Sequence, residues 1–221
     1  MSDFINTVDV IGDEAVAASI IDRTITEFAD NTIQTTQGYI FSYCSNLESV
    51  NLPMCENIGG DTFSNCTNLK NVSLPRIKSV PYQAFSGCTN LETIKFPSAT
   101  STGASAFSAC YKLKQIDFSS KIHFVDAFRT CYSLISVILR SESVCSVQAS
   151  NIFRECSHIT GTVHATYNPD GLKDGYIYVP KALVEEYKVA TNWTTYADRF
   201  RALEDYTVDG TITGELDETK I

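Results

Sequence analysis

The 221-residue sequence contains no apolar run close to the ~20 residues that a membrane-spanning helix needs. Basic residues are also scarce, since 17 Lys and Arg stand against 26 Asp and Glu and give a formal net charge of −9. Binding to the phosphates of a nucleic acid requires a concentrated basic surface, and the sequence offers none. We therefore expect neither membrane insertion nor nucleic-acid binding.

The N-terminus, MSDFINTVDV, lacks the basic and apolar segments of a secretory signal peptide. We therefore expect the chain to begin in a reducing cytoplasm, even if the protein later reaches another location. Acidic residues concentrate near both ends, within residues 1–30 and 204–221, whereas the middle is nearly neutral. The length suits one domain or two and is sufficient to bury a sizeable core.

Only three histidines are present, and none belongs to a recognisable catalytic or metal-binding pattern. The sequence has no HExxH motif, no Cys–His or Ser–His–Asp arrangement, and no GxGxxG or P-loop for a nucleotide. Acidic side chains such as Glu48, Glu92 and Asp117 are expected to face solvent, without a paired-carboxylate signature. We therefore expect a non-enzymatic protein with no cofactor and no metal. The three histidines are then surface or structural residues: His123, His158 and His164.

One thirteen-residue phrase occurs three times at a spacing of 22 residues, as FSYCSNLESVNLP, FSNCTNLKNVSLP and FSGCTNLETIKFP. Weaker copies continue the series. The aligned phenylalanines are Phe41, Phe63, Phe85, Phe107, Phe128 and Phe153. The cysteines three places later are Cys44, Cys66, Cys88, Cys110, Cys131 and Cys156. A fixed period of this size indicates a solenoid, in which each unit is completed by stacking on its neighbours.

Within one unit, the apolar spacing changes from helical to strand-like. Phe, Cys and Leu recur every third residue, which favours a short helical or 3₁₀ turn with one buried side. The next stretch, such as ETIKF, alternates and is rich in β-branched residues, which predicts a short strand. Pro53, Pro75 and Pro97 follow three of these strands, where the missing N–H ends the ladder. Each unit is therefore predicted to be a turn, a parallel strand and a return loop.

The phrase F-x-x-C-x-x-L-x-x-[VI]-x-[LF]-P, repeated about every 22 residues, resembles the BspA-type leucine-rich repeat. The resemblance covers roughly residues 25–160. It implies a right-handed, curved solenoid used for binding, as in bacterial surface proteins and in structural proteins of phages and prophages. The last two units depart from the pattern, because ISVIL lacks the proline and SHITGTV loses the strand spacing. Beyond about residue 140 the pattern therefore no longer predicts regular stacking.

Both ends are predicted to cover the core that a solenoid exposes at its termini. GDEAVAASIID, residues 12–22, has helical apolar spacing and acids in its first turn, which predicts a capping helix. GYIYVP predicts a strand stopped by Pro180, and an amphipathic helix over KALVEEYKVA and a second helical piece follow. The fold class is therefore an α/β solenoid of leucine-rich repeats with helical caps. Its expected parts are an N-terminal cap (1–24), the solenoid (25–162), a C-terminal strand–helix cap (163–206) and an acidic tail (207–221), which is either flexible or a docking segment.

The repeated cysteine has several possible roles. A zinc site needs paired ligands only two to four residues apart, which the six aligned cysteines do not provide. Stacked coils could bring them within disulfide range, but side chains stacked in parallel point the same way and a reducing compartment disfavours the bond. We expect a structural ladder of buried free thiols that pack as small hydrophobes. Cys55 and Cys145 lie outside the ladder and are also expected to be free.

Outward strand positions offer a candidate binding surface. They are Ser49/Asn51, Asn71/Ser73, Thr93/Lys95, Gln115/Asp117 and Ser136/Ile138. This is a small polar face without the aromatic platform that sugar stacking usually uses. Tyr111 and Tyr132 follow ladder cysteines in adjacent units, where they form either an exposed contact surface or a pair partly buried under a loop. The predicted binding residues are Thr93, Lys95, Gln115, Asp117, Tyr111 and Tyr132.

Two segments add a resemblance to phage proteins. INTVDVIGDEAVAASIIDRTITEF looks like the start of phage-encoded repeat proteins, and the IYVP–helix–NW–helix ending resembles a segment that closes such repeats in gut Firmicutes and their phages. With the missing signal peptide, this leads us to expect a non-catalytic phage virion protein, in the tail or decorating the head, used for adhesion or assembly. The alternative is a BspA-like adhesin on a bacterial cell surface. The expected partner is a protein or a surface glycan, and the sequence predicts no oligomeric state.

Overall fold

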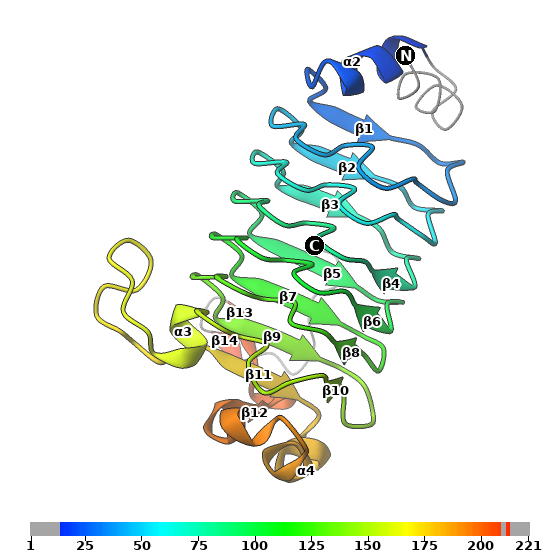
Figure 1. Cartoon of the computed structure of the whole chain (residues 1–221). Helices are drawn as coiled ribbons and strands as arrows, with labels where there is room; N and C mark the ends of the chain where they lie inside the picture. Colours follow the sequence, from blue (N-terminus) through cyan, green and yellow to red (C-terminus); the bar gives the residue numbers. More distant parts are fainter. Residues whose placement is uncertain (1–13, 209–210, 213–221) are drawn as a thin grey trace.

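The repeats fold into coils that stack along one axis (Figure 1). This arrangement is seen in a computed structural model of the chain, which describes residues 14–208 and 211–212. Strands one coil apart pair in parallel, with Val50 opposite Val72 and Ile94 opposite Ile116. The predicted α/β solenoid is therefore confirmed.

One long side of the solenoid is the main sheet, formed by the strands predicted from the alternating stretches. A three-stranded part has the order β1–β2–β3, and a five-stranded part has the order β12–β11–β9–β7–β5. Strand β3 and strand β5 are neighbours in the stack but are not joined by a hydrogen-bonded ladder. The bounds are β1 Glu27–Ala29, β2 Ser49–Asn51, β3 Asn71–Ser73, β5 Thr93–Phe96, β7 Gln115–Phe118, β9 Ser136–Leu139, β11 Tyr176–Val179 and β12 Phe200–Ala202.

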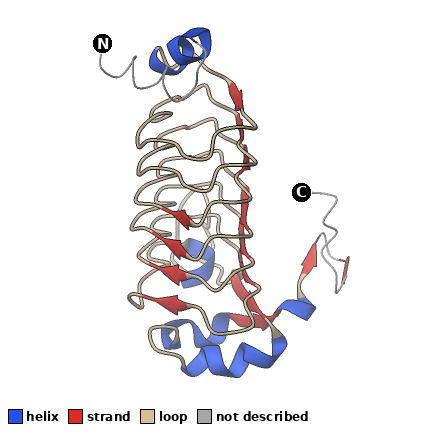
Figure 2. Cartoon of the chain, turned by 90° about the vertical axis from the view of Figure 1, so that its right-hand side faces the viewer, coloured by secondary structure: helices blue, strands red, loops and turns tan. Residues whose placement is uncertain are grey.

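A second sheet of two-residue strands forms another side (Figure 2). Its order is β10–β8–β6–β4, again parallel and one coil apart. The bounds are β4 Ser79–Val80, β6 Ser101–Thr102, β8 His123–Phe124 and β10 Ser146–Val147. These short strands lie within the predicted return loops, where no strand was expected.

The Phe–Cys–Leu segments form hydrogen-bonded turns on a third side, which we call the turn face. In the first unit the amide of Cys44 donates to the carbonyl of Phe41, and the amide of Leu47 donates to the carbonyl of Cys44. These i→i+3 bonds agree with the predicted tight turn, although no helix is assigned to it. The phenylalanines point inward and stack coil on coil, with ring centroids 5.3 Å apart for Phe41–Phe63 and 5.6 Å for Phe85–Phe107. The turns therefore build the core of the solenoid.

Charged side chains at one position of the coil alternate in sign along the stack. Lys70 binds Glu48 at 3.1 Å, and Lys114 binds Glu92 at 2.8 Å, each pair joining neighbouring coils. These side chains are more than half exposed, so each pair contributes at most about 1 kcal/mol. The alternation of charge nevertheless favours the observed order of coils, because pairing one coil with the next but one would place like charges side by side.

Parallel stacking continues past residue 140, where the repeat pattern predicts no regular stacking, because β10 pairs with β8 one coil earlier. Strand β9 pairs in register with β7, although its sequence lacks the proline. The next strand position is taken by β11, which pairs with β9 only after helix α3 (Ser157–Thr160) and a loop of residues 161–175. The departure at SHITGTV is therefore an insertion within the coil, after which the chain returns to the main sheet.

Helices lie at both ends of the stack (Figure 1). At the N-terminal end, α2 (Glu14–Ile21) occupies the middle of the predicted helix at 12–22, and its Ile20 is buried. At the C-terminal end, the predicted amphipathic helix is divided into η1 (Lys181–Leu183) and α4 (Val184–Val189), and η2 (Thr194–Arg199) follows. The capping role of these segments and the four-part division of the chain remain predictions.

The C-terminal segment docks through buried aromatic side chains that bind backbone groups of the last coils. Trp193 Nε1 donates to the carbonyl of Cys145 at 2.7 Å, and the Tyr187 hydroxyl accepts from the Cys145 amide at 2.8 Å. The chain ends with η3 (Leu203–Asp205) and a hairpin of β13 (Thr207–Val208) and β14 (Thr211–Ile212). Figure 2 shows this hairpin off the outward side of the main sheet. Residues 213–221 of the predicted acidic tail lie outside the described residues.

Candidate binding surface

The outward side chains of the main sheet form two rows along the stack, because strands in register place equivalent residues side by side. The first row contains Glu27, Ser49, Asn71, Thr93, Gln115, Ser136 and Tyr176. The second row contains Ala29, Asn51, Ser73, Lys95, Asp117, Ile138 and Tyr178. Neighbouring strands of a sheet lie ~4.8 Å apart, so the rows present polar groups at that spacing.

The N-terminal part of this face is open. Asn51, Asn71, Ser73 and Thr93 are exposed, and Lys95 is partly exposed. No described residue hydrogen-bonds to the side chains of Asn51, Asn71 or Thr93. We call the outward positions of β1, β2, β3 and β5 the open rows.

The prediction that Asp117 faces solvent is wrong. Its carboxylate is only 3% exposed and is held by Arg140, which follows β9. Arg140 Nε donates to both carboxylate oxygens at 3.0 and 3.1 Å, and a terminal nitrogen donates to one of them at 2.9 Å. Two nitrogens of one guanidinium thus satisfy the buried charge, and this arrangement makes such a pair tolerable in a core. Asp117 is therefore not available to a partner.

Ser136 and Ile138 also point outward and yet are buried, contrary to the predicted open face. The chain returns over this part of the sheet at Tyr206, whose hydroxyl donates to Gln115 Oε1 at 2.6 Å. The Tyr206 ring packs edge-on against Tyr178, with centroids 4.6 Å apart. The C-terminal part of the sheet face is therefore closed by the chain itself, and Gln115 has an internal partner.

Tyr111 and Tyr132 lie away from the sheet face, under the loop of residues 161–175. Their rings stack on each other at 5.3 Å, and Tyr132 also stacks on Tyr167 at 5.4 Å and lies 4.0 Å from His164. Burial raises the pKa of Tyr132, and the nearby Glu155 carboxylate adds to the effect. Of the two outcomes left open by the sequence, partial burial under a loop is the one observed. The six predicted binding residues are thus not one surface.

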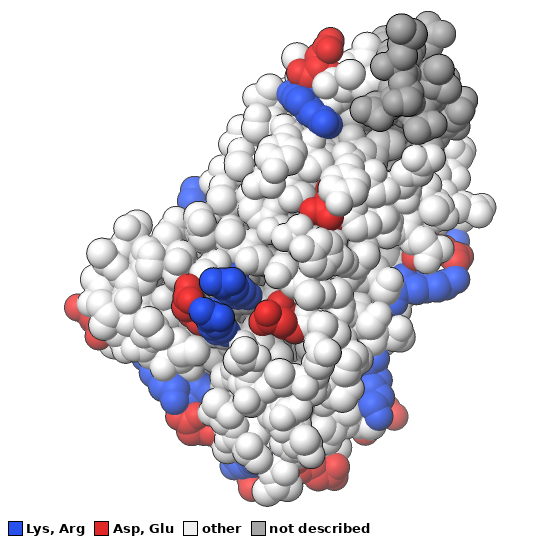
Figure 3. Space-filling model, viewed as in Figure 1, with Lys and Arg blue, Asp and Glu red and all other residues white. Residues whose placement is uncertain are grey.

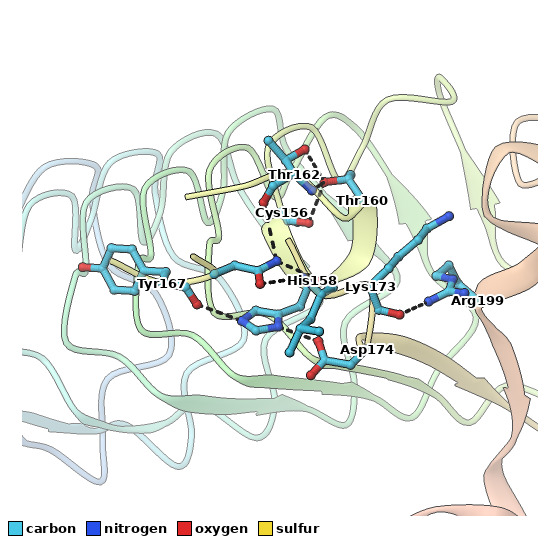
Figure 4. Close-up of polar contacts among 10 residues, drawn as sticks. Cys156, His158, Thr160, Thr162, Tyr167, Lys173, Asp174 and Arg199 are labelled. Atoms are coloured by element: carbon cyan, nitrogen blue, oxygen red, sulfur yellow. Dashed lines mark hydrogen bonds and ion pairs between the residues drawn. The ribbon is translucent and has the colours of Figure 1, made fainter. Parts of the chain in front are cut away.

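The loop that covers these tyrosines is held by polar contacts (Figure 4). His158 Nδ1 lies 2.6 Å from Asp174 Oδ1, and its Nε2 lies 3.1 Å from the carbonyl oxygen of Tyr167. A terminal nitrogen of Arg199 donates to the carbonyl of Lys173 at 2.5 Å. His158 therefore has a structural role, because its side chain connects α3 to two separate parts of the loop, at Tyr167 and at Asp174.

All eight cysteines are buried and free. Each thiol of the later ladder positions donates to the carbonyl oxygen of the phenylalanine one coil earlier. The Sγ–O distances are 3.0 Å for Cys66–Phe41, 3.2 Å for Cys88–Phe63, 3.1 Å for Cys110–Phe85, 3.1 Å for Cys131–Phe107 and 2.7 Å for Cys156–Phe128. Burial raises the pKa of the Cys88, Cys110 and Cys131 thiols well above its usual range, so these groups stay protonated donors. The ladder thus carries inter-coil hydrogen bonds as well as packing.

One Ser–His contact escaped the sequence patterns. His123 Nδ1 lies 2.8 Å from Ser146 Oγ across the second sheet, with both residues exposed. No described carboxylate bonds to this histidine, so the third member of a catalytic triad is missing from the part of the chain that the structure covers. Among the same residues, no three His, Cys, Asp or Glu side chains gather as a metal site. Within the described ranges no helix is long and apolar enough to cross a bilayer.

Sequence reasoning missed the aromatic end of the sheet face. Tyr176 and Tyr178 lie opposite Ser136 and Ile138 and extend the two rows. The guanidinium carbon of Arg201 lies 4.2 Å from the centre of the Tyr176 ring. The signal was present in YIYV, since its alternation places both tyrosines on the side opposite Ile177 and Val179.

These features agree with the comparison of the sequence with known families. The profile described as BspA type leucine rich repeat region matches residues 3–76 and 34–160 in a form with six copies. The chain belongs to this family. The BspA-type assignment, first suggested by the repeated phrase, is thereby confirmed. No curated protein matches the chain significantly in sequence.

Solved structures of several bacterial proteins resemble the BspA-type chain. The pneumococcal vaccine antigen PcpA superposes with a TM-score of 0.57 at 15% identity, over 80% of this chain and 40% of that one. A leucine rich cell surface protein of Faecalibacterium prausnitzii gives 0.49 at 24% identity, over 54% of this chain and 33% of that one. A leucine-rich repeat protein of Treponema pallidum gives 0.47 at 23% identity, over 64% and 74%. The chain therefore spans well under half of the first two proteins, and the likeness to PcpA shows a shared fold.

Proposed function

We propose that this BspA-type chain is a non-catalytic binding module that holds a macromolecular partner on its open rows. The observation that carries the proposal is the contrast within one sheet face. Its C-terminal part is closed by Tyr206 and the Asp117–Arg140 pair, whereas Asn51, Asn71 and Thr93 remain exposed, with no side-chain hydrogen bond to any described residue. Side-chain amides and hydroxyls that are exposed in register can both donate hydrogen bonds to a partner and accept them from it.

The partner chemistry that suits the open rows is polar and extended. Side-chain amides and hydroxyls repeat at ~4.8 Å, so a glycan chain or a strand-like protein segment can bond to several coils at once. Glu27 and Lys95 lie near the two ends of the array and add one charge of each sign. Leucine-rich repeat proteins generally bind proteins, which supports a protein partner, and a glycan is the alternative.

We place the module on a bacterial cell surface, as an adhesin. Support comes from the family, because the BspA-type resemblance implies surface proteins that bind host molecules. The test is a screen of the purified chain against immobilised glycans, host-matrix proteins and whole cells. A second arm uses the chain truncated after Tyr206, which separates binding by the repeats from binding by the tail. Saturable binding by both forms is expected, and the absence of any binding would defeat the proposal.

A phage virion protein is the second candidate. It is supported by the opening segment, INTVDVIGDEAVAASIIDRTITEF, and by its resemblance to phage-encoded repeat proteins. In this case the same open rows would contact another virion protein or the host surface. Mass spectrometry of purified phage particles from the source decides between the two, since the virion assignment requires the chain to be present in washed particles.

A further inference from the structure

The turn face carries two columns of residues in the left-handed backbone conformation. One column lies two residues before each phenylalanine and contains Tyr39, Asp61, Gln83, Ser105 and Asp126. The other lies just before each ladder cysteine and contains Tyr43, Asn65, Gly87, Ala109, Thr130 and Glu155. Glycine, asparagine and aspartate tolerate this conformation best, and bulky side chains are uncommon in it. The two tyrosines of the first coil are therefore unusual occupants.

Three tyrosines on this face stand out from the surface. Tyr39 and Tyr43 are each 65% exposed, and Tyr82 is 53% exposed. The strained backbone of Tyr39 and Tyr43 is thus not offset by burial of their rings. Exposed tyrosine is enriched at protein interfaces, where its ring supplies contact area and its hydroxyl a hydrogen bond. Figure 3 views this face and shows charged side chains gathered mainly on its C-terminal part.

The three tyrosines lie on the coils before and after the turn that contains Asp61. The Tyr39 amide donates to the carbonyl of Gly60 at 3.0 Å, and the Asp61 amide donates to the carbonyl of Tyr82 at 2.9 Å. The Tyr43 amide donates to the carbonyl of Ser64 at 2.7 Å. Each tyrosine is therefore one backbone hydrogen bond away from the turn that contains Asp61.

Asp61 is 6% exposed, and no described residue hydrogen-bonds to its carboxylate or forms an ion pair with it. This contrasts with Asp117, the other well-buried acid, which has Arg140. Its carboxylate oxygens still touch solvent, so a charged donor of a partner can reach them and pair with them. The carboxylate of Asp61 thus lies between two coils that carry exposed aromatic rings, and such rings attract cations through their faces.

We propose that Asp61, Tyr39, Tyr43 and Tyr82 form a site for an arginine side chain of a partner protein. A guanidinium is planar, so it can stack on a tyrosine ring while its N–H groups donate to the carboxylate. The site goes beyond the proposed function by naming one chemical feature of a protein partner. It lies on the turn face, apart from the open rows of the main sheet.

The test is an NMR titration of the full chain with N-acetyl-arginine methylamide, followed by ¹H–¹⁵N spectra. The neutral control ligand is the citrulline analogue, which has nearly the same shape and no charge. Saturable shifts are expected at Tyr39, Asp61 and Tyr82 with the arginine derivative only. Equal shifts with citrulline, or shifts centred on other residues, would overturn the proposal.

Two variants complete the test. Asp61→Asn removes the charge and suits the left-handed backbone, and it is expected to weaken binding by about tenfold. Asp126→Asn makes the same change in the same column, at a carboxylate whose Oδ1 is fully buried and unpaired among the described residues, and it is expected to leave binding unchanged. Similar affinities of the wild type and Asp61→Asn would contradict the site. Binding to cells and glycans is measured separately, so that the two proposals can fail independently. Binding to cells or glycans without an arginine response rejects the arginine site alone. An arginine response without binding to cells or glycans rejects the proposed adhesin alone.

Discussion

The thiol of Cys88 donates a hydrogen bond to the carbonyl oxygen of Phe63, one coil earlier in the solenoid. The same carbonyl also accepts the Cys66 amide of its own turn. The thiol thus joins two successive turns through one oxygen. This contact repeats along the ladder. It gives a physical reason for the regular spacing of the cysteines in the sequence.

Replacing Cys88 tests this role of the thiol. Cys88→Ala removes the donor and leaves a small cavity, and it is expected to lower the free energy of unfolding by about 2 kcal/mol. Cys88→Ser keeps a donor and should lose less than Cys88→Val, which keeps apolar bulk without a donor. Urea unfolding followed by circular dichroism measures the three values. A valine variant as stable as the wild type would show that packing alone matters.

The buried thiols also predict a pH dependence of stability. Burial raises the pKa of Cys88, Cys110 and Cys131 in the folded chain, whereas an unfolded thiol ionises near its ordinary value of about 8.5. Above that pH the unfolded state binds fewer protons, so the free energy of unfolding falls as pH rises. The thiol contribution is fully present below this range. Urea midpoints at about pH 7 and about pH 10 check the direction, and a rise at the higher pH would contradict it.

The Asp117–Arg140 pair should behave as a coupled unit. Arg140→Ala leaves a buried carboxylate unpaired and is expected to cost about 3 kcal/mol. Asp117→Ala removes that penalty, so the double variant should be more stable than the sum of the single losses predicts. A double-mutant cycle from urea unfolding measures the coupling. Strictly additive losses would mean that the two groups do not depend on each other.

His158 is expected to control the loop of residues 161–175. His158→Ala removes the contacts to Asp174 and to the Tyr167 carbonyl, so the loop should open more often and expose Tyr132. Limited proteolysis should then cut the loop faster than in the wild type, with the solenoid left intact. His123→Ala is the control, because that histidine is exposed on the second sheet. Equal cleavage rates of all three proteins would remove the anchoring role.

The repeat period was enough to predict the solenoid, the parallel strands and the inward side chains. Phe85, Cys88 and Leu91 point into the core because their three-residue spacing matches one turn, and Ile94 and Phe96 do so because a strand alternates. The spacing of residues within a single repeat is therefore enough to predict which of these side chains point into the core. Burial of the cysteines followed from it, but the direction in which each S–H points did not, since that depends on the neighbouring coil.

The candidate surface was harder to predict because distant segments decide which part is open. Gln115 is bonded to Tyr206, 91 residues away, and no periodic pattern relates the two. Tyr132 is covered by a loop inserted in the last coil, and Asp117 is paired with an arginine outside the repeated phrase. Local patterns therefore predicted which residues point outward, and tertiary contacts decided which of them stay exposed.

Partner binding by the open rows is tested most directly by one matched pair of variants, assayed against whole cells and against any glycan or protein found in the screen. Asn71→Arg places a bulky charge in the middle of the open rows, and Thr100→Arg makes the same change at an exposed position outside them. We expect at least about tenfold weaker binding by Asn71→Arg and wild-type binding by Thr100→Arg. Unchanged binding by Asn71→Arg, with the fold intact, would contradict the assignment of the open rows as the binding surface.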